Sequence, residues 1–325
     1  MSISFSIVDG PEFGATASFI LEEAWTPPVP SYSPEYLKWQ MSFPSAAPGH
    51  AVAAFDGPEP VGFAGTTGRR LRNASVTIDV VVVSFVAVRP GWHRRGIASG
   101  LYETLLQRLF EVGATVVTYA TPSSAGDNAI LKVYPLAGFD VVSLGTYNGY
   151  GFAQRRRPAE TDWRACFSED RDSIERLAVN PSVLGKSVLY NSPTPLQMDH
   201  YFKDPRPRRL IVAEHKRLGT QGAAFALCAE LRTAQGTVHT ATLDCAWLSS
   251  VDADGVRAVL DLASTAWPDT MPSGQVVMCP NLCTVEEDSL KAAGLRRTGA
   301  QFIGYICAPR GRQLPRFDTT NLEIV

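Results

Sequence analysis

The sequence predicts a mixed α+β protein of two domains, each a twisted, mostly antiparallel sheet flanked by helices. Its 325 residues exceed one ordinary domain and fit two cores of roughly 150 residues each. Strand and helix patterns alternate along the first half, and their order partly repeats in the second half. A charged, irregular stretch, QRRRPAETD at 154–162, separates the two halves. We therefore expect domains at residues 1–155 and 156–325, the second a degenerate copy of the first.

Local patterns predict the elements of the first half. Ser33 is expected to cap a helix that has Pro34 at its first position. Two apolar runs around the turn residues DGPEP predict a hairpin, and β-branched residues predict a buried strand over 75–88. Apolar residues at helical spacing from Ile97 predict a helix that ends at Gly113. The other expected elements are a strand and a helix within residues 1–30, a strand at VVTYA, a helix at NAILKVY and a hairpin at FDVVSLGTYNGYGF.

The second half carries a similar series of patterns. We expect strands at RLIVAEH, GAAFALCAEL and TVHTATLDCAWL, then a helix at VDADGVRAVLDLASTAW, a strand at QVVMC, a short helix at EEDSLKAAG and a final strand at RTGAQFIGYICA. Because this order partly repeats that of the first half, it indicates an internal duplication.

Composition and charge exclude several classes of protein. Apolar residues make up 45% of the chain and charged residues 19%, and no apolar run is long enough to cross a bilayer. The net charge is −2, and no region has the basic footprint of a nucleic-acid binder. The first residues, MSISFSIVDG, lack a secretory signal. We expect a cytoplasmic monomer or dimer that binds neither nucleic acid nor membrane.

All six cysteines lie in the second half, which does not suit a disulfide framework across two domains. Cys279 and Cys283 have no nearby histidine and no second cysteine pair, so they make a poor zinc site. Several of the others sit in apolar runs, where cysteine packs as a small hydrophobic residue. We expect reduced thiols and no bound metal.

The stretch VAVRPGWHRRGIASGLYETLL, residues 86–106, predicts an anion site. A strand that stops at Pro90 and a helix that starts near Arg95 leave the first N–H groups of the helix without intrahelical partners. The helix dipole and the charges of Arg94 and Arg95 favour an anion there, and Gly96 has no side chain to block its approach. A diphosphate on the N–H groups of residues 94–99 is expected, although this pattern alone is a weak signal.

The surroundings of this loop resemble motif A of the GCN5-related N-acetyltransferase (GNAT) superfamily. In that motif a central strand is followed by Gln/Arg-x-x-Gly-x-Gly/Ala and a helix, and coenzyme A lays its pyrophosphate on the loop. The matching residues are Val86, Val88, Pro90, Arg94, Arg95, Gly96, Ile97 and Ala98. His93 departs from the pattern, since Gln or Arg is usual there, which leaves one side-chain contact open.

A second stretch, DNAILKVYPLAGF, resembles the family motif Asn-x-x-Ala-x-x-Leu-Tyr-x-x-x-Gly-Phe. Asp127 stands at the Asn position, Tyr134 at the Tyr, and Gly138 and Phe139 close the pattern. The resemblance covers about residues 40–150, whereas the second half matches only in element order. Its corresponding corner, VDADG, is acidic, so we expect the second half to bind no coenzyme A.

The resemblance implies an acyl-CoA-dependent N-acyltransferase and assigns its binding residues. The backbone of Phe85, Val86, Ala87 and Val88 would bind the pantetheine arm and the thioester carbonyl. Tyr134 matches the tyrosine that acts as general acid beside the sulfur, with a purely structural tyrosine as the alternative. The amine would attack directly, because no cysteine lies near the matched motifs. The other implied coenzyme-binding residues are His93, Arg94, Arg95, Gly96, Ile97, Ala98, Ser99 and Asp127.

The general base is left open between three groups. Asp79 lies upstream on the central strand, although a strand-end carboxylate is about as often a solvated charge. His200 has a suitable intrinsic pKa, the acidic neighbour Asp199 and aromatic neighbours, but a lone histidine is more often structural. Some tandem relatives use the terminal carboxylate, which here belongs to Val325.

Aromatic residues provide the sequence evidence about the acceptor. Trp25, Tyr32 and Trp39 crowd residues 25–39, where hydrophobic core is the default role, and Trp39 is a candidate for the acceptor wall. Trp163 could cap a cleft between the domains. These features favour a bulky acceptor or a long acyl chain rather than a small polyamine, with acetyl-CoA or a longer-chain acyl-CoA as the co-substrate. The chain is similar to the glucosamine N-acyltransferases of teicoplanin-type glycopeptide pathways. The alternatives are an aminoglycoside-type N-acetyltransferase and a non-catalytic acyl-CoA sensor.

Overall fold

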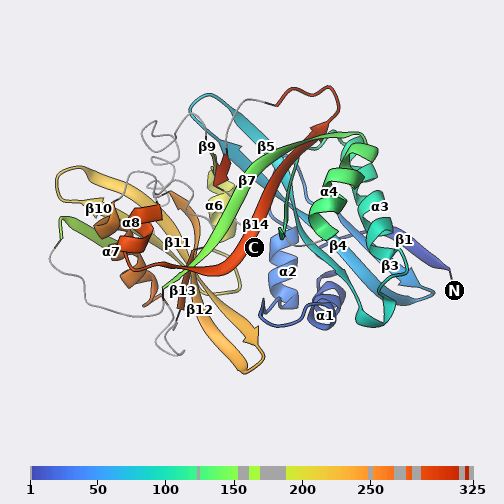
Figure 1. Ribbon diagram of the computed structural model, residues 1–325, viewed down its shortest axis with the longest axis horizontal. Helices are drawn as coiled ribbons and strands as arrows, with labels where there is room; N and C mark the ends of the chain where they lie inside the picture. Colours follow the sequence, from blue (N-terminus) through green and yellow to red (C-terminus); the bar gives the residue numbers. More distant parts are fainter. Residues whose placement is uncertain are drawn as a thin grey trace.

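The computed structural model describes residues 2–122, 125–152, 161–168, 188–247, 252–266, 276–279, 287–314 and 319–321. These residues form the predicted α+β fold, in which helices flank a long twisted sheet (Figure 1). The sheet is continuous through both halves of the chain rather than split into two. Within the described residues, no helix is both long and apolar enough to span a membrane.

The first half contains the elements that its patterns predict. Ser33 caps α2 through a hydrogen bond from Tyr36 N to Ser33 Oγ of 3.2 Å, and Pro34 is the first residue of the helix. The elements are β1 (Ile3–Val8), α1 (Gly14–Ala24), β2 (Val29–Pro30), α2 (Pro34–Met41), β3 (Ala51–Asp56), β4 (Glu59–Arg72), β5 (Thr77–Val88), the 3-10 turn Pro90–Trp92, α3 (Ile97–Glu111), β6 (Val116–Ala120), α4 (Ala125–Leu136) and β7 (Phe139–Phe152).

The second half also follows its predicted order, with additional elements before and after it. The predicted elements are β10 (Arg208–His215), β11 (Gly219–Thr233), β12 (Gly236–Trp247), α7 (Ala253–Ala263), β13 (Val276–Cys279), α8 (Glu287–Ala292) and β14 (Arg296–Pro309). The sequence patterns did not predict β8 (Trp163–Ser168), β9 (Val188–Asn191), α6 (Pro195–Tyr201) or β15 (Thr319–Asn321). The expected linker is mostly outside the described residues.

Two long strands cross from one half of the protein to the other. The main strand order is β1-β3-β4-β5-β6-β14-β7-β13-β12-β11-β10-β8. Strand β14, from the end of the chain, therefore lies between β6 and β7 of the first half, and β7 in turn pairs with β13 of the second half. Figure 1 shows β7 and β14 running side by side through the centre of the molecule. Each half thus completes its sheet with a strand from the other.

The hairpin predicted over residues 139–152 is wrong, because these residues form the single strand β7. Gly145 has a φ of 89°, and the pairing of β7 with β14 shifts register opposite this residue. The glycine therefore marks a bulge rather than a turn. The sequence near Gly145 favours a turn by itself, but pairing with β14 along most of its length keeps β7 extended.

The sheet separates two apolar cores. On one face, Leu101 of α3 and Tyr134 of α4 share a core with Val81 of β5. On the other face, α1, α2 and α6 cover a core in which Phe85 of the first half meets Phe225 of the second half. Because this second core draws on both halves, it fixes them against each other.

A buried charge cluster reinforces the junction. The Arg208 guanidinium contacts Asp204 at 2.8 Å and Asp244 at 2.6 Å, and all three side chains are at most 1% exposed. It also lies over the Tyr201 ring at 4.9 Å. Burial alone would raise the pKa of Asp204, but Arg208 and Arg206 hold it below its usual value. Removing one partner of such a pair would leave a buried charge uncompensated.

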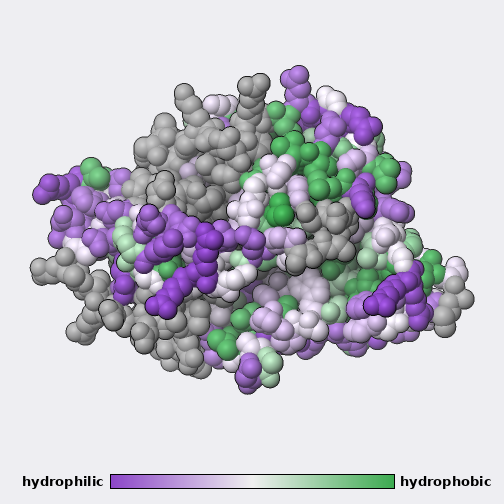
Figure 2. Space-filling model, in the orientation of Figure 1, coloured by the Kyte–Doolittle hydropathy of each residue, from purple (hydrophilic) through white to green (hydrophobic). Residues whose placement is uncertain are grey.

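On the face of Figure 2, hydrophilic side chains cover the α8 region, whereas apolar side chains gather over the region of α4 and β7. Leu136 at the end of α4 and Val142 on β7 are 87% and 48% exposed. These apolar residues are on the surface, unlike Ile306 on β14, which is fully buried in the first half.

We predict that Ile306→Ala lowers the free energy of unfolding by about 3 kcal/mol, because it leaves a cavity in a strand shared between the halves. Val142→Ala, which removes exposed methyl groups from the neighbouring strand, should change it by less than about 1 kcal/mol. Urea unfolding followed by circular dichroism measures both. Equal losses in the two variants would contradict the assignment of β14 to the core of the first half.

Candidate active site

Strands β5 and β6 separate part-way along their length. They pair in parallel at Val81 with Val116 and at Val82 with Val117, after which β5 continues to Val88 beside β4 alone. The register between β4 and β5 also shifts here, because Gly65 faces Phe85 whereas Thr66 faces Val83. The extra residue in β5 is a bulge, which bends the strand and increases its twist. Residues 85–88 therefore have one paired edge and one open edge.

Only alternate residues turn their backbone polar groups to the open edge. Arg89 N donates to Val61 O of β4 at 3.0 Å. Because backbone groups alternate in direction along a strand, Phe85 and Ala87 also face β4, whereas the N–H and C=O groups of Val86 and Val88 face the open edge. The side chains of Trp25 and His93 contact these carbonyls: Trp25 Nε1 lies 3.4 Å from Val86 O, and His93 Nε2 lies 2.8 Å from Val88 O. Of the predicted residues, Val86 and Val88 thus turn their backbone groups to the open edge, and Phe85 and Ala87 do not.

The loop that follows β5 adopts a conformation that aims N–H groups outward. Arg94 and Gly96 have positive φ values of 62° and 76°, and a Cβ added to Gly96 would project into open space. No side chain of the described residues caps α3, and its first internal hydrogen bond runs from Gly100 N to Gly96 O. The N–H groups of residues 97–99 are therefore unpaired within the helix, as an anion site requires.

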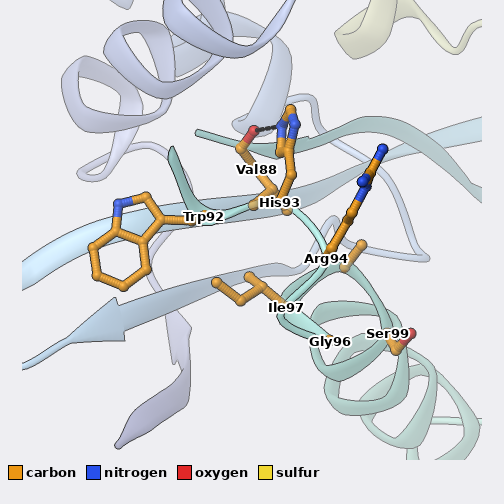
Figure 3. A pocket seen from close by; sticks show the side chains of 8 residues that line it. Val88, Trp92, His93, Arg94, Gly96, Ile97 and Ser99 are labelled. Carbon is orange, nitrogen blue, oxygen red and sulfur yellow. Dashed lines mark hydrogen bonds between the residues drawn. The ribbon is translucent and has the colours of Figure 1, made fainter. Parts of the chain in front are cut away.

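A hollow of about 280 Å³ lies against these N–H groups (Figure 3). In Figure 3, His93 turns back to Val88. The Arg95 guanidinium lies 4.6 Å from the centre of the Trp92 ring, and Arg94 and Arg95 are both exposed. Two positive charges therefore lie beside the hollow, and no ion pair recorded among the described residues neutralises them. Its lining residues are Val88, Trp92, His93, Arg94, Gly96, Ile97, Ala98 and Ser99.

The corresponding helix of the second half is closed to anions. Asp252 caps α7 and accepts a hydrogen bond of 3.0 Å from Gly255 N. A carboxylate that already occupies the helix N-terminus satisfies an N–H group and would repel a phosphate. The N-terminus of α7 therefore differs from the open N-terminus of α3.

Tyr134 lies on α4 beneath the open edge and is completely buried. Its ring packs edge to face against Tyr102 and Phe139, at centroid distances of 6.4 and 6.1 Å. The hydroxyl has no hydrogen bond of normal geometry among the described residues. Burial raises the pKa of Tyr134 well above its usual value, Tyr102 and Cys307 add to this, and Thr118 acts against it. The phenol is therefore neutral at physiological pH. The side chain of Asp127 is outside the described part.

The candidate bases do not gather at this site. Asp79 is at the start of β5, six residues before Phe85, which corresponds to about 20 Å of strand. His200 lies on α6 and forms a reciprocal pair with Trp39: His200 Nε2 donates to Trp39 O and Trp39 Nε1 donates to His200 O, both at 2.8 Å. Burial, the main cause, lowers the pKa of His200. Val325 is outside the described residues.

The expectation that Trp163 caps a cleft between the halves is wrong. Strand β8, which begins with Trp163, is the outermost strand of the second half. Side chains alternate along it, so Trp163 packs on the side of α7, with His215 edge to face at 5.1 Å. The sequence placed Trp163 next to the linker but could not show to which face of the sheet its side chain turns. Trp39 is buried in the core between the halves rather than on an open wall.

Trp25 and Tyr32, which the sequence offered only as members of the aromatic segment 25–39, lie near the open edge of β5. Trp25 follows α1 and contacts Val86 O, and Tyr32 lies between Trp25 and Phe85. The crowding of aromatic residues over 25–39 was the only sequence signal for them. Their approach to β5 depends on how α1 packs on the sheet, which no local pattern encodes.

Comparison with known proteins supports the assignment of the first half. The Acetyltransferase (GNAT) family pattern matches residues 17–139. No curated protein sequence matches the chain significantly.

Solved structures share the fold across nearly the whole chain. N-myristoyltransferase of Saccharomyces cerevisiae with bound myristoyl-CoA has a TM-score of 0.66 and 11% identity, and the match covers 95% of this chain and 83% of that one. A putative acetyltransferase of Pyrococcus horikoshii has a TM-score of 0.58 and 13% identity, over 98% and 91%. A probable N-acyltransferase of Enterococcus faecalis has a TM-score of 0.55 and 11% identity, over 94% and 72%.

At these identities the structures establish the fold, which they share with this chain over most of its length. The second half lacks the open helix terminus of the first. Residues 17–139 thus match the Acetyltransferase (GNAT) family, and the protein is an enzyme of the N-acyltransferase class.

Proposed function

We propose that this enzyme transfers an acyl group from acyl-CoA to the amine of a bulky amino-sugar acceptor, such as a glycopeptide antibiotic intermediate. The observation that carries the coenzyme part is the uncapped N-terminus of α3 beside the open edge of β5. A helix terminus binds the diphosphate, and an exposed strand edge binds a chain that contains amide groups. The two features are adjacent and in line.

Different residues of the chain would bind different parts of the coenzyme. The N–H groups of Ile97, Ala98 and Ser99 would hold the diphosphate, with Arg94 and Arg95 beside it. The backbone groups of Val86 and Val88 would bond the amides of the pantetheine arm. Trp25 and His93 contact the two carbonyls in this structure, so both side chains would have to share or release them.

The chemistry then requires a neutral amine and a proton donor. As the amine attacks the thioester carbonyl, a C–N bond forms, the C–S bond breaks and the departing thiolate takes up a proton. Tyr134 supports the donor role, because burial keeps its phenol protonated. Since Asp79 lies far along the strand and His200 Nε2 bonds Trp39 O, we propose that the amine binds neutral and loses one proton to water after the C–N bond forms. Tyr134, after donating to the thiolate, regains a proton from water.

A second hollow supports a sugar as the acceptor. It has a volume of about 190 Å³ and lies where α1 and β2 meet β11 of the second half. Hydroxyl groups, an aromatic ring and an ion pair suit a polyhydroxylated ring better than an aliphatic amine. Glu22 in its wall is paired with Arg232 at 3.0 Å, so the hollow is not strongly acidic, which disfavours a polycationic aminoglycoside. The polar lining residues are Ser18, Glu22, Ser31, Tyr32, Ser33 and Arg232.

We predict that Gly96→Asp weakens coenzyme A binding at least about tenfold, because a fixed carboxylate would face the diphosphate. Gly113→Asp is the matched control at the other end of α3. Both glycines have positive φ, 76° and 65°, and both have open space where a Cβ would project. Backbone strain is therefore similar in the two variants. Calorimetry with coenzyme A should show the loss only in Gly96→Asp; equal affinities would contradict the diphosphate site.

We further predict that Tyr134→Phe lowers kcat by about 100-fold and leaves the KM for acyl-CoA nearly unchanged, since the hydroxyl acts on the leaving thiolate. Tyr102→Phe, which changes the neighbouring buried tyrosine, should retain most of the activity. Because burial raises the pKa of Tyr134 well above 10, its ionisation should not reduce the wild-type rate below about pH 10. Release of coenzyme A with a panel of amino sugars measures the rate. Binding without turnover in the wild type would instead indicate an acyl-CoA sensor.

A further inference from the structure

Three aromatic side chains close one side of the open edge of β5. Trp25 packs edge to face on Tyr32 with ring centroids 5.5 Å apart, and Tyr32 packs edge to face on Phe85 at 5.6 Å. We call Trp25, Tyr32 and Phe85 the aromatic wall. The hydrogen bond of Trp25 Nε1 to Val86 O at 3.4 Å ties the outer end of the wall to the strand edge itself.

The wall lies at the reactive end of the proposed coenzyme site. The diphosphate loop follows Val88, and the free backbone groups of β5 run from Val88 back to Val86. An arm that follows these groups reaches Phe85 next, at the bulge and about 10 Å from Val88 along the strand. Phe85 turns its ring to the face of the sheet that α1 and α2 cover. The acyl group would therefore meet the wall.

The wall has a packed core behind it. Tyr32 stacks on Tyr36 at 5.8 Å, and Tyr36 and Leu21 are each 1% exposed. The backbone of Trp25 is held by a hydrogen bond from its N–H to Leu21 O of 3.0 Å. Burial raises the pKa of Tyr32 to about 12, and its partly buried ring packs against this core. Interiors packed in this way admit additional methylene groups only by displacing side chains, which is costly.

We propose that Trp25 and Tyr32 limit the length of the acyl group, so that the enzyme accepts acetyl and similarly short groups and excludes fatty acyl chains. This inference rests on the proposed function, because it assumes that acyl-CoA occupies the loop and the open edge. Trp25 is the residue that sets the limit most directly, because it contacts both the strand edge and Tyr32. The yeast structure with a bound myristoyl chain shares the fold, so a wall of this kind is a local difference rather than a property of the fold.

Calorimetry with three ligands tests the limit: coenzyme A, acetyl-CoA and octanoyl-CoA. In the wild type, coenzyme A and acetyl-CoA should bind with similar affinity, and octanoyl-CoA at least about tenfold more weakly. Trp25→Ala should bring octanoyl-CoA to the affinity of acetyl-CoA. The readout is the ratio of the two affinities within one variant, because loss of Trp25 also frees Val86 O and alters the binding of all three ligands alike. Trp25→Phe, which keeps a ring, should retain the wild-type preference.

Phe110→Ala serves as a matched aromatic deletion, because Phe110 is 43% exposed at the far end of α3, about 20 Å from the loop. It should retain the wild-type preference. If Trp25→Ala does not fold, Trp25→Leu provides the smaller side chain with less loss of packing.

The outcomes separate the two levels of the proposal. Tight binding of octanoyl-CoA to the wild type, or an unchanged preference in both Trp25→Ala and Trp25→Leu, would overturn the length limit and leave the coenzyme site standing. A wild type that binds none of the three ligands would overturn the proposed function, and the length limit with it.

Discussion

The outward direction of the first N–H groups of α3 depends on two residues with left-handed backbone conformations, Arg94 and Gly96. They turn the chain sharply between the end of β5 and the start of α3, so the helix begins with no side chain over its N-terminus. For Arg94 this conformation carries a steric cost that glycine avoids. The rest of the proposed site is built around this terminus, since both the open edge of β5 and Tyr134 matter only if the coenzyme is held there.

The two halves of the protein show how a similar framework serves different purposes. In the first half, α3 leaves its terminal N–H groups available, whereas in the second half Asp252 occupies those of α7. The second half instead contributes strand β14 to the sheet of the first, and residues such as Phe225 and Arg208 to the core between them. Its role in this account is to complete and brace the first half, and to supply one wall of the polar hollow beside α1 through Arg232.

Features encoded within a few residues could be predicted from the sequence. Ser33 and Pro34 mark the start of α2 because capping and a fixed proline φ are local effects. Gly96 and its basic neighbours mark the loop because a glycine that permits left-handed backbone stands directly before a helix. These signals placed the diphosphate loop and Tyr134 on the elements where the structure has them.

Features that depend on distant segments could not be predicted in this way. Gly145 in β7 looks like a turn residue until β14, more than 150 residues later in the chain, is known to pair beside it. His200 and Trp39 were considered separately, yet each side chain donates to the backbone carbonyl of the other residue across 161 residues of sequence. Trp163 illustrates the same difficulty, because its distance from the linker is small in sequence but its side chain lies on the α7 face of an edge strand.

The central claim is that the N–H groups of Ile97, Ala98 and Ser99 bind the diphosphate of coenzyme A. Its most direct test is a titration with coenzyme A that follows backbone amide resonances by NMR, with the Asp252-capped start of α7 as an internal control. The account predicts large shifts of the amides at residues 96–100 and none at residues 253–256; unchanged resonances at the start of α3 would contradict it.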